Sequence, residues 1–163
     1  PEAAYGPLIS PEAKVRVEGL IEAGIAEGAE CLLDGRFCDV PGYPVGNWVG
    51  PTLFRGVTPE MSIYKEEIFG PVAVVYSYDS IDEAVELAND SSFGLSGSVW
   101  GKDTDKAEQI ARRLEVGMTY VNEHGTTKAG LPFGGVRRSG YGRELGRWGF
   151  GEFANTKLVR VAK

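Results

Sequence analysis

The sequence predicts an α/β fold with a parallel sheet, and two observations carry this prediction. Residues 72–76 form a nearly continuous apolar run, V-A-V-V-Y, which is typical of a strand buried on both faces. Along the rest of the chain, segments of strand type alternate at short intervals with segments of helical type. Such alternation indicates βαβ units, in which a helix connects two parallel strands.

The first half of the chain is predicted to contain one long helix followed by strands. The helix starts at Ser10, where a capping hydroxyl precedes a proline and an acidic residue in the first turn. Gly24 and Gly28 weaken the helix and are expected to end it. The strands are predicted at residues 29–35, 51–54 and 72–76, with a proline- and glycine-rich loop over residues 41–51.

The second half is predicted to contain two further helices and a long loop. Residues 80–83 match the S-x-x-E capping box, so Glu83 is expected to accept a hydrogen bond from the backbone N–H of Ser80. Asp103 or Thr104 is expected to cap the next helix. The other predicted elements are strands at 97–100 and 118–122, a loop over 123–142, and a surface or edge strand at 153–161.

The composition is that of a globular domain and argues against two classes of partner. The chain has 163 residues, of which 42% are hydrophobic, and no apolar run approaches the roughly 20 residues that span a bilayer. Lys and Arg total 17 against 23 Asp and Glu, which gives a formal charge of -6. A basic face for nucleic acid and a polybasic membrane anchor are therefore not expected.

The cysteines and the histidine do not suggest a metal site. Cys31 and Cys38 are the only cysteines, their spacing is not C-x-x-C, and the single histidine, His124, is distant in sequence. One possible bridge does not make a disulfide scaffold, so we expect a reducing, cytoplasmic setting. His124 could be a general base or a pocket wall, although a lone histidine is more typical of local hydrogen bonding.

Two segments contain residues that could carry chemistry. Residues 66–71 (E-E-I-F-G-P) are either a solvated turn with Phe69 in the core or a carboxylate and an aromatic facing one ligand. Residues 132–144 contain glycines at 134, 135, 140 and 142, which indicate sharp turns or a close approach of the backbone to another group. The G-x-G at 140–142 does not follow a strand, so it is not a dinucleotide-binding fingerprint.

Taken together, these segments resemble the aldehyde dehydrogenase superfamily, in the family's order and over essentially the whole chain. The most specific blocks are E-E-I-F-G-P-V at 66–72 and P-F-G-G-x-x-x-S-G-x-G-R-E at 132–144. The other matching segments are Y-G-P-L-I at 5–9, G-P-T-L at 50–53, F-G-L-S-G-S-V at 93–99 and V-N at 121–122.

The resemblance implies oxidation of an aldehyde to a carboxylic acid with NAD or NADP. A cysteine thiolate attacks the aldehyde, the thiohemiacetal passes a hydride to the cofactor, and water activated by a glutamate releases the acid. The family's nucleophile lies upstream of the block at 6–9, whereas Cys31 and Cys38 follow that block. We therefore expect the chain to be part of a longer polypeptide, to carry no catalytic residue itself and to be inactive alone.

The resemblance also assigns two cofactor contacts and a division of the chain. Glu67 matches the glutamate that accepts hydrogen bonds from the nicotinamide ribose, and Phe69 matches the aromatic beside the nicotinamide ring. Residues 1–152 would be the later part of the catalytic domain. Residues 153–163 would be a strand that joins a neighbouring subunit, which implies a homo-oligomer, a dimer or a tetramer.

A substrate-anchor loop is implied at about residues 123–133. Within it, His124, Thr126, Thr127 and Phe133 would line the aldehyde tunnel, a mixture that suits an aldehyde with a polar or carboxylate end. The block at 131–145 looks most like the succinate-semialdehyde branch of the family. Arg137 and Arg138 could attract an acidic substrate, although charged side chains in a loop are usually only solvated.

Two alternatives to an enzyme part remain open at this point. The chain could be a non-catalytic, truncated paralogue that serves as an assembly or binding module. An unrelated α/β binding domain would require both long motif blocks, at 66–72 and 132–144, to be coincidental.

Overall fold

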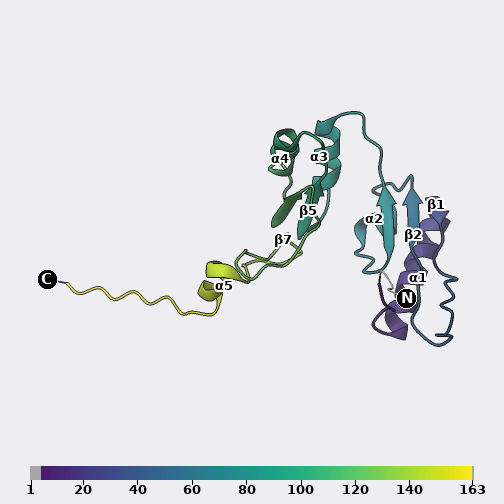
Figure 1. Cartoon of the computed structure of the whole chain (residues 1–163), viewed down its shortest axis with the longest axis horizontal. Coiled ribbons are helices and arrows are strands. Elements are labelled where there is room, and N and C mark those ends of the chain that lie inside the picture. The colour runs from purple at the N-terminus through teal and green to yellow at the C-terminus, as the bar shows by residue number, and fades with distance from the viewer. Residues whose placement is uncertain (1–4, 163) are drawn as a thin grey trace. The chain divides into compact units, whose positions relative to one another are not determined.

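The computed structural model describes residues 5–162, which form two compact units, residues up to Ser77 and residues from Tyr78 onward (Figure 1). Positions 1–4 of the predicted catalytic part and position 163 of the predicted terminal strand lie outside the described residues. Among the described residues, no helix is both long enough and apolar enough to cross a membrane.

The first unit is a mixed three-stranded sheet with a long helix on one face. The sheet has the order β1-β2-β3; β1 and β2 are antiparallel, and β2 and β3 are parallel, with Thr52 opposite Val72. The helix α1 lies against the sheet (Figure 1), and its Val17 and Ile21 pack in one core cluster with Phe54. The elements are α1 (Pro11–Ala26), β1 (Glu30–Leu33), β2 (Thr52–Arg55), α2 (Ser62–Lys65) and β3 (Val72–Val75).

The boundaries of α1 agree with the prediction. The Ser10 side chain caps the helix by accepting a hydrogen bond from the backbone N–H of Ala13 at 3.2 Å, and Pro11 occupies the first turn. The helix ends at Ala26, and Gly28 follows with φ 101°, a left-handed conformation that favours glycine.

The prediction for β3 needs a correction. Val72 and Val74 pack against the core cluster, whereas Ala73 and Val75 are exposed. The strand is therefore buried on one face of the described unit, because α1 and α2 cover only that face.

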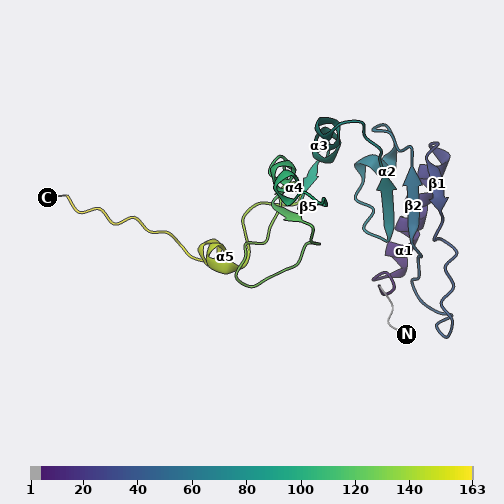
Figure 2. The same cartoon turned by 45° about the horizontal axis from the view of Figure 1, so that its top comes forward.

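The second unit contains the predicted βαβ arrangement. The strands β5 (Ser96–Val99) and β6 (Met118–Val121) are parallel, and α4 (Thr104–Ala111) packs against both through Ala107 and Ala111 (Figure 2). Asp103 caps α4 by accepting a hydrogen bond from Lys106 N–H at 3.0 Å, one of the two caps predicted. The remaining elements are α3 (Ile81–Asn89), the antiparallel pair β4 (Phe93–Gly94) and β7 (Val136–Arg137), and α5 (Gly146–Glu152).

The capping box at α3 forms with one change from the prediction. The Ser80 hydroxyl accepts a hydrogen bond from the backbone N–H of Glu83 at 3.1 Å, as expected. The Glu83 carboxylate reaches one residue further back than predicted and accepts from the backbone N–H of Asp79 at 2.7 Å. The side chain is long enough for either donor, and the chain path before the helix brings Asp79 into range.

The predicted strand at 153–161 does not form in this chain. These residues adopt no helix or strand, and Leu158 and Val159 are strongly exposed. A strand needs a neighbouring strand for its backbone hydrogen bonds, and none of the described residues supplies one. Pairing of this tail with another subunit stays a prediction.

Two glycines in α1 allow a direct test of helix packing. A Cβ atom on Gly24 would lie 2.6 Å from Cδ1 of the buried Ile63, whereas a Cβ on Gly19 would meet nothing within 4 Å. We expect Gly24→Ala to lower the free energy of unfolding by about 1 kcal/mol or more, because overpacking outweighs the gain in helix propensity. Gly19→Ala, the matched control, should raise it by ~0.5–1 kcal/mol. Urea unfolding measures both changes, and equal gains would contradict the packing of α1 on α2.

Candidate functional site

The 66–71 segment is fastened to α1 by polar and apolar contacts. Nη1 of Arg16 donates to the carbonyl oxygen of Ile68 at 2.7 Å, and Nη2 donates to the carbonyl oxygen of Glu67. A Cβ on Gly70 would lie 2.9 Å from both γ-carbons of Val17, so glycine permits this close approach of segment and helix. The segment therefore has a defined position on the first unit, just before β3 begins.

Phe69 lies on the surface, not in the core. Its side chain is 80% exposed, and its φ of 53° is in the left-handed region, where non-glycine residues are uncommon. The side chain packed against the core cluster is that of Ile68. The interpretation that places Phe69 in the core is therefore wrong. A non-glycine residue in this region costs about 1–3 kcal/mol and persists only where surrounding contacts impose it.

Glu67 is also exposed, so the segment presents a carboxylate and an aromatic ring at its surface. Among the described residues, no side chain or backbone group hydrogen-bonds the Glu67 carboxylate; the contact from Arg16 is to its backbone carbonyl. A free carboxylate can accept hydrogen bonds from two hydroxyl groups at once. The two predicted cofactor residues thus lie close together in sequence and are both accessible to a ligand.

Three of the four predicted substrate residues line one hollow in the second unit. Thr126, Thr127 and Phe133 contribute to a cavity of about 200 Å³ with the chain at 117–120. His124 is not among the lining residues; its ring packs against Trp100, with ring centroids 5.4 Å apart. The hollow has a mixed polar and apolar lining without the histidine, and its role as an aldehyde tunnel stays a prediction.

Sequence reasoning missed other side chains of this hollow, among them Tyr120 and Lys128. Tyr120 lies on β6, directly before the anchor loop, and its ring would be 3.1 Å from a Cβ on Gly125. Lys128 forms an ion pair with Glu123 at 3.5 Å, and Thr126 donates to the same carboxylate at 3.3 Å. The signal that could have found Tyr120 was its place in the predicted strand at 118–122, which leads into the anchor loop.

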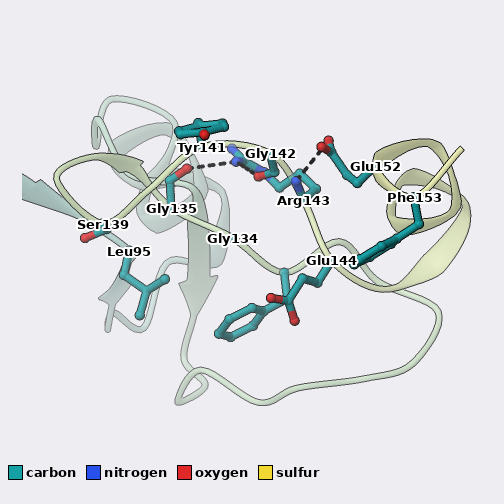
Figure 3. A pocket seen from close by; sticks show the side chains of 11 residues that line it. Leu95, Gly134, Gly135, Ser139, Tyr141, Gly142, Arg143, Glu144, Glu152 and Phe153 are labelled. Carbon is teal, nitrogen blue, oxygen red and sulfur yellow. Dashed lines mark hydrogen bonds between the residues drawn. The ribbon is translucent and has the colours of Figure 1, made fainter. Parts of the chain in front are cut away.

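The 132–144 loop is held together by its own backbone and by Arg143. Phe133 and Glu144 exchange both backbone hydrogen bonds, at 2.9 and 2.7 Å. Nη1 of Arg143 donates to the carbonyl oxygens of Gly135 and Gly142 at 2.8 and 2.6 Å (Figure 3). These contacts border a second hollow of about 230 Å³, whose lining includes Leu95, Tyr141 and Phe153 (Figure 3).

The glycines of this loop have the role that the sequence indicates. A Cβ on Gly135 would lie 2.6 Å from Cβ of Ser139, and the carbonyl of Gly134 comes within 1.9 Å of a Cβ placed on Gly117. The Ser139 hydroxyl accepts a hydrogen bond from the backbone N–H of Gly94 at 3.0 Å. The backbone therefore passes too close to its neighbours to carry side chains at these positions.

Arg137 and Arg138 are engaged within the second unit. Arg137 donates to the carbonyl oxygens of Asn89 and Ser91 at 2.7 and 2.5 Å, and it pairs with Glu115. It thereby satisfies backbone groups at the end of α3. The guanidinium of Arg138 lies over the ring of Phe93, 4.8 Å from its centroid. These contacts explain both arginines without an acidic substrate.

Cys31 does not have the character of a nucleophilic thiol. Both cysteines are free thiols, and burial raises the pKa of the Cys31 thiol, with a further contribution from the charge of Asp34. A nucleophilic cysteine requires the opposite shift. Among residues 5–162, no cluster of three or more His, Cys, Asp or Glu side chains could hold a metal ion.

The chain belongs to the aldehyde dehydrogenase family, whose model matches residues 1–159. It is 46% identical over 161 residues to a succinate-semialdehyde dehydrogenase [NADP(+)] from Deinococcus radiodurans, covering 99% of this chain and 33% of that protein. A betaine aldehyde dehydrogenase from Bacillus subtilis is 42% identical, with 97% and 32% covered.

Solved structures give the same result for the fold. The succinic semialdehyde dehydrogenase of Streptococcus pyogenes in complex with NADP+ matches with a TM-score of 0.90 and 40% identity, covering 100% of this chain and 35% of that one. An aldehyde dehydrogenase from Mycobacterium tuberculosis complexed with NAD+ matches with a TM-score of 0.85 and 42% identity, covering 93% and 31%. The chain thus spans about a third of the length of these relatives.

The two thiols should differ in reactivity. Cys38 is exposed, whereas Cys31 is partly buried, has a raised pKa and donates to the carbonyl oxygen of Leu33 at 3.3 Å. Because the thiolate is the reactive form, we expect iodoacetamide near neutral pH to label Cys38 several-fold faster than Cys31. Peptide mass spectrometry measures the two rates, and unfolding in urea should bring them together. Faster labelling of Cys31 in the folded chain would contradict its assignment as an unreactive thiol.

Proposed function

We propose that this chain is part of an NAD(P)-dependent aldehyde dehydrogenase and supplies its contacts to the nicotinamide end of the cofactor. The observation that carries the proposal is the 66–71 segment, which α1 holds so that Glu67 and Phe69 are both exposed. Family membership and the cofactors named in the two related structures support it.

The residues fit the two chemical needs of a bound nicotinamide nucleoside. The exposed Glu67 carboxylate would accept hydrogen bonds from the two ribose hydroxyls, which would fix the orientation of the sugar. The exposed ring of Phe69 packs beside the nicotinamide ring and restricts its position, since hydride transfer is sensitive to small displacements. When bound, NAD or NADP supplies the oxidising equivalent by accepting a hydride.

The reaction proposed for the whole enzyme is oxidation of an aldehyde to a carboxylic acid through a cysteine thiohemiacetal. The nucleophilic cysteine is proposed to belong to a part of the enzyme that this chain does not contain, because both cysteines follow the block at 6–9 and burial raises the pKa of the Cys31 thiol. The chain alone is therefore proposed to be inactive.

The hollow lined by Thr126, Thr127 and Phe133 is proposed to receive the aldehyde. Two hydroxyl groups and one aromatic ring suit a short substrate with an apolar middle and a polar or carboxylate end. Succinate semialdehyde has this character and is the substrate in the name of the Deinococcus relative.

The tail is proposed to join a neighbouring subunit in a homo-oligomer, a dimer or a tetramer. Its apolar residues Leu158, Val159 and Val161 are exposed, and strand addition would satisfy its backbone groups. The cytoplasmic, reducing setting is part of the same proposal, and the free thiols of Cys31 and Cys38 are compatible with it.

Replacement of Glu67 tests the cofactor contact. In the full-length enzyme, Glu67→Gln keeps the shape of the side chain but removes its charge, so we expect kcat to fall about tenfold and the KM for the nucleotide to rise. Steady-state kinetics with varied nucleotide measures both changes. Glu66→Gln, at the adjacent exposed acid, is the matched control and should leave both constants unchanged. Wild-type kinetics in Glu67→Gln would remove the assignment.

The isolated chain tests the division of the active site. We expect the purified 163-residue chain to oxidise no aldehyde with either NAD or NADP, because the proposed nucleophile lies in another part of the enzyme. The absorbance of the reduced nucleotide, followed beside the full-length Deinococcus relative as a positive control, measures turnover. Any cofactor-dependent turnover that persists through purification would overturn the proposal that the nucleophile lies elsewhere.

A further inference from the structure

Arg16 is placed unusually for an arginine on the surface of a helix. The other arginines of the first unit pair with acids: Arg36 with Asp34 at 2.7 Å, and Arg55 with Glu30 at 2.7 Å. Among the described residues, Arg16 has no carboxylate partner, and its guanidinium donates to two carbonyl oxygens of the 66–71 segment. The charged guanidinium of Arg16 therefore binds neutral backbone groups of the segment that carries the proposed cofactor residues.

The two carbonyls that Arg16 binds belong to consecutive residues. The carbonyl of Glu67 forms the peptide group between residues 67 and 68, and the carbonyl of Ile68 forms the peptide group that leads into Phe69. A guanidinium is a planar, rigid fork, so two bonds from it fix the orientation of both peptide groups together. These orientations set the directions in which the Glu67 and Phe69 side chains leave the backbone.

Apart from the bonds from Arg16, backbone hydrogen bonds hold the segment at its two ends, from Glu66 N–H to the carbonyl of Ser62 and from Thr52 N–H to the carbonyl of Pro71, both at 2.9 Å. Between these ends, little else in the first unit constrains the side chains of Glu67 and Phe69. Both are exposed, so packing does not hold them. The segment is anchored on its apolar side by Ile68 in the core cluster and by the contact of Gly70 with Val17. These contacts fix its distance from α1, but apolar contacts are not directional enough to fix the rotation of the peptide groups. Arg16 supplies that directional constraint.

We propose that Arg16 is a positioning residue for the cofactor, acting through the backbone carbonyls of Glu67 and Ile68 on the Glu67 and Phe69 side chains, without touching the cofactor itself. The inference rests on the proposed function of those two residues. It predicts that loss of the guanidinium disturbs the geometry of hydride transfer more than it disturbs the fold, because Ile68 and Gly70 still anchor the segment.

The test uses Arg16→Ala and Arg16→Lys in the full-length enzyme, with kcat, the nucleotide KM and the thermal midpoint measured for each. We expect Arg16→Ala to lower kcat about tenfold and to raise the nucleotide KM. Arg16→Lys should recover only part of the loss, since an ammonium group lacks the fork that aligns two carbonyls. Arg55→Ala, which removes an exposed arginine of the same unit, is the matched control for stability and should keep wild-type kinetics.

A combination with Glu67→Gln separates positioning from a general structural effect. If Arg16 acts through Glu67, Arg16→Ala should cost less in the Glu67→Gln background than in the wild type. Equal costs in the two backgrounds, or wild-type kinetics in Arg16→Ala beside a slow Glu67→Gln, would overturn this inference alone. Wild-type kinetics in Glu67→Gln would overturn the proposed function and this inference with it. If Arg16→Ala does not fold, Arg16→Lys decides: slower turnover at an unchanged midpoint supports the inference, and wild-type kinetics overturns it.

Discussion

The contact between α1 and the 66–71 segment is the interaction on which the first unit depends for its proposed role. Val17 faces Gly70 from the helix, and one turn of α1 also carries Arg16 to the carbonyls of Glu67 and Ile68. A side chain larger than hydrogen at position 70 would separate the helix from the segment. Because the segment leads directly into β3, its position also follows from the parallel pairing of β2 and β3. The helix, the sheet and the proposed cofactor contacts are thus coupled through one small core.

In the second unit, a long loop with little regular secondary structure is held in a defined position. The 132–144 loop achieves this with the paired backbone of Phe133 and Glu144, the two bonds from Arg143 and close approaches that only glycine allows. Phe133 lines two hollows of the unit. The glycine-rich motif therefore holds the wall of the proposed substrate hollow that contains Phe133. The polar residues of the anchor loop can then change without moving this wall.

Exposed apolar side chains mark the faces at which each unit lacks a neighbour. Val75 lies on the uncovered face of the first sheet, and Leu158 and Val159 lie on a tail with no strand partner among the described residues. The relatives are about three times longer than this chain. Under the proposed function, these faces are where other parts of the enzyme, or another subunit, would pack. The proposed function gives the exposure of Glu67 and Phe69 the same meaning, since both would contact the cofactor.

The sequence by itself determined the features that depend on local chemistry. The caps at Ser10, Ser80 and Asp103 and the βαβ unit around α4 follow from short-range patterns, and the family follows from two specific motif blocks. Only the tertiary structure decided which side chains face outward. Phe69 and Ile68 are adjacent apolar residues, and no local pattern indicates that Ile68 packs against the core while Phe69 faces outward with a positive φ. Likewise, no local pattern encodes the contact of His124 with Trp100 or the hydrogen bonds of Arg16 to a segment some 50 positions away. Both arise from long-range packing.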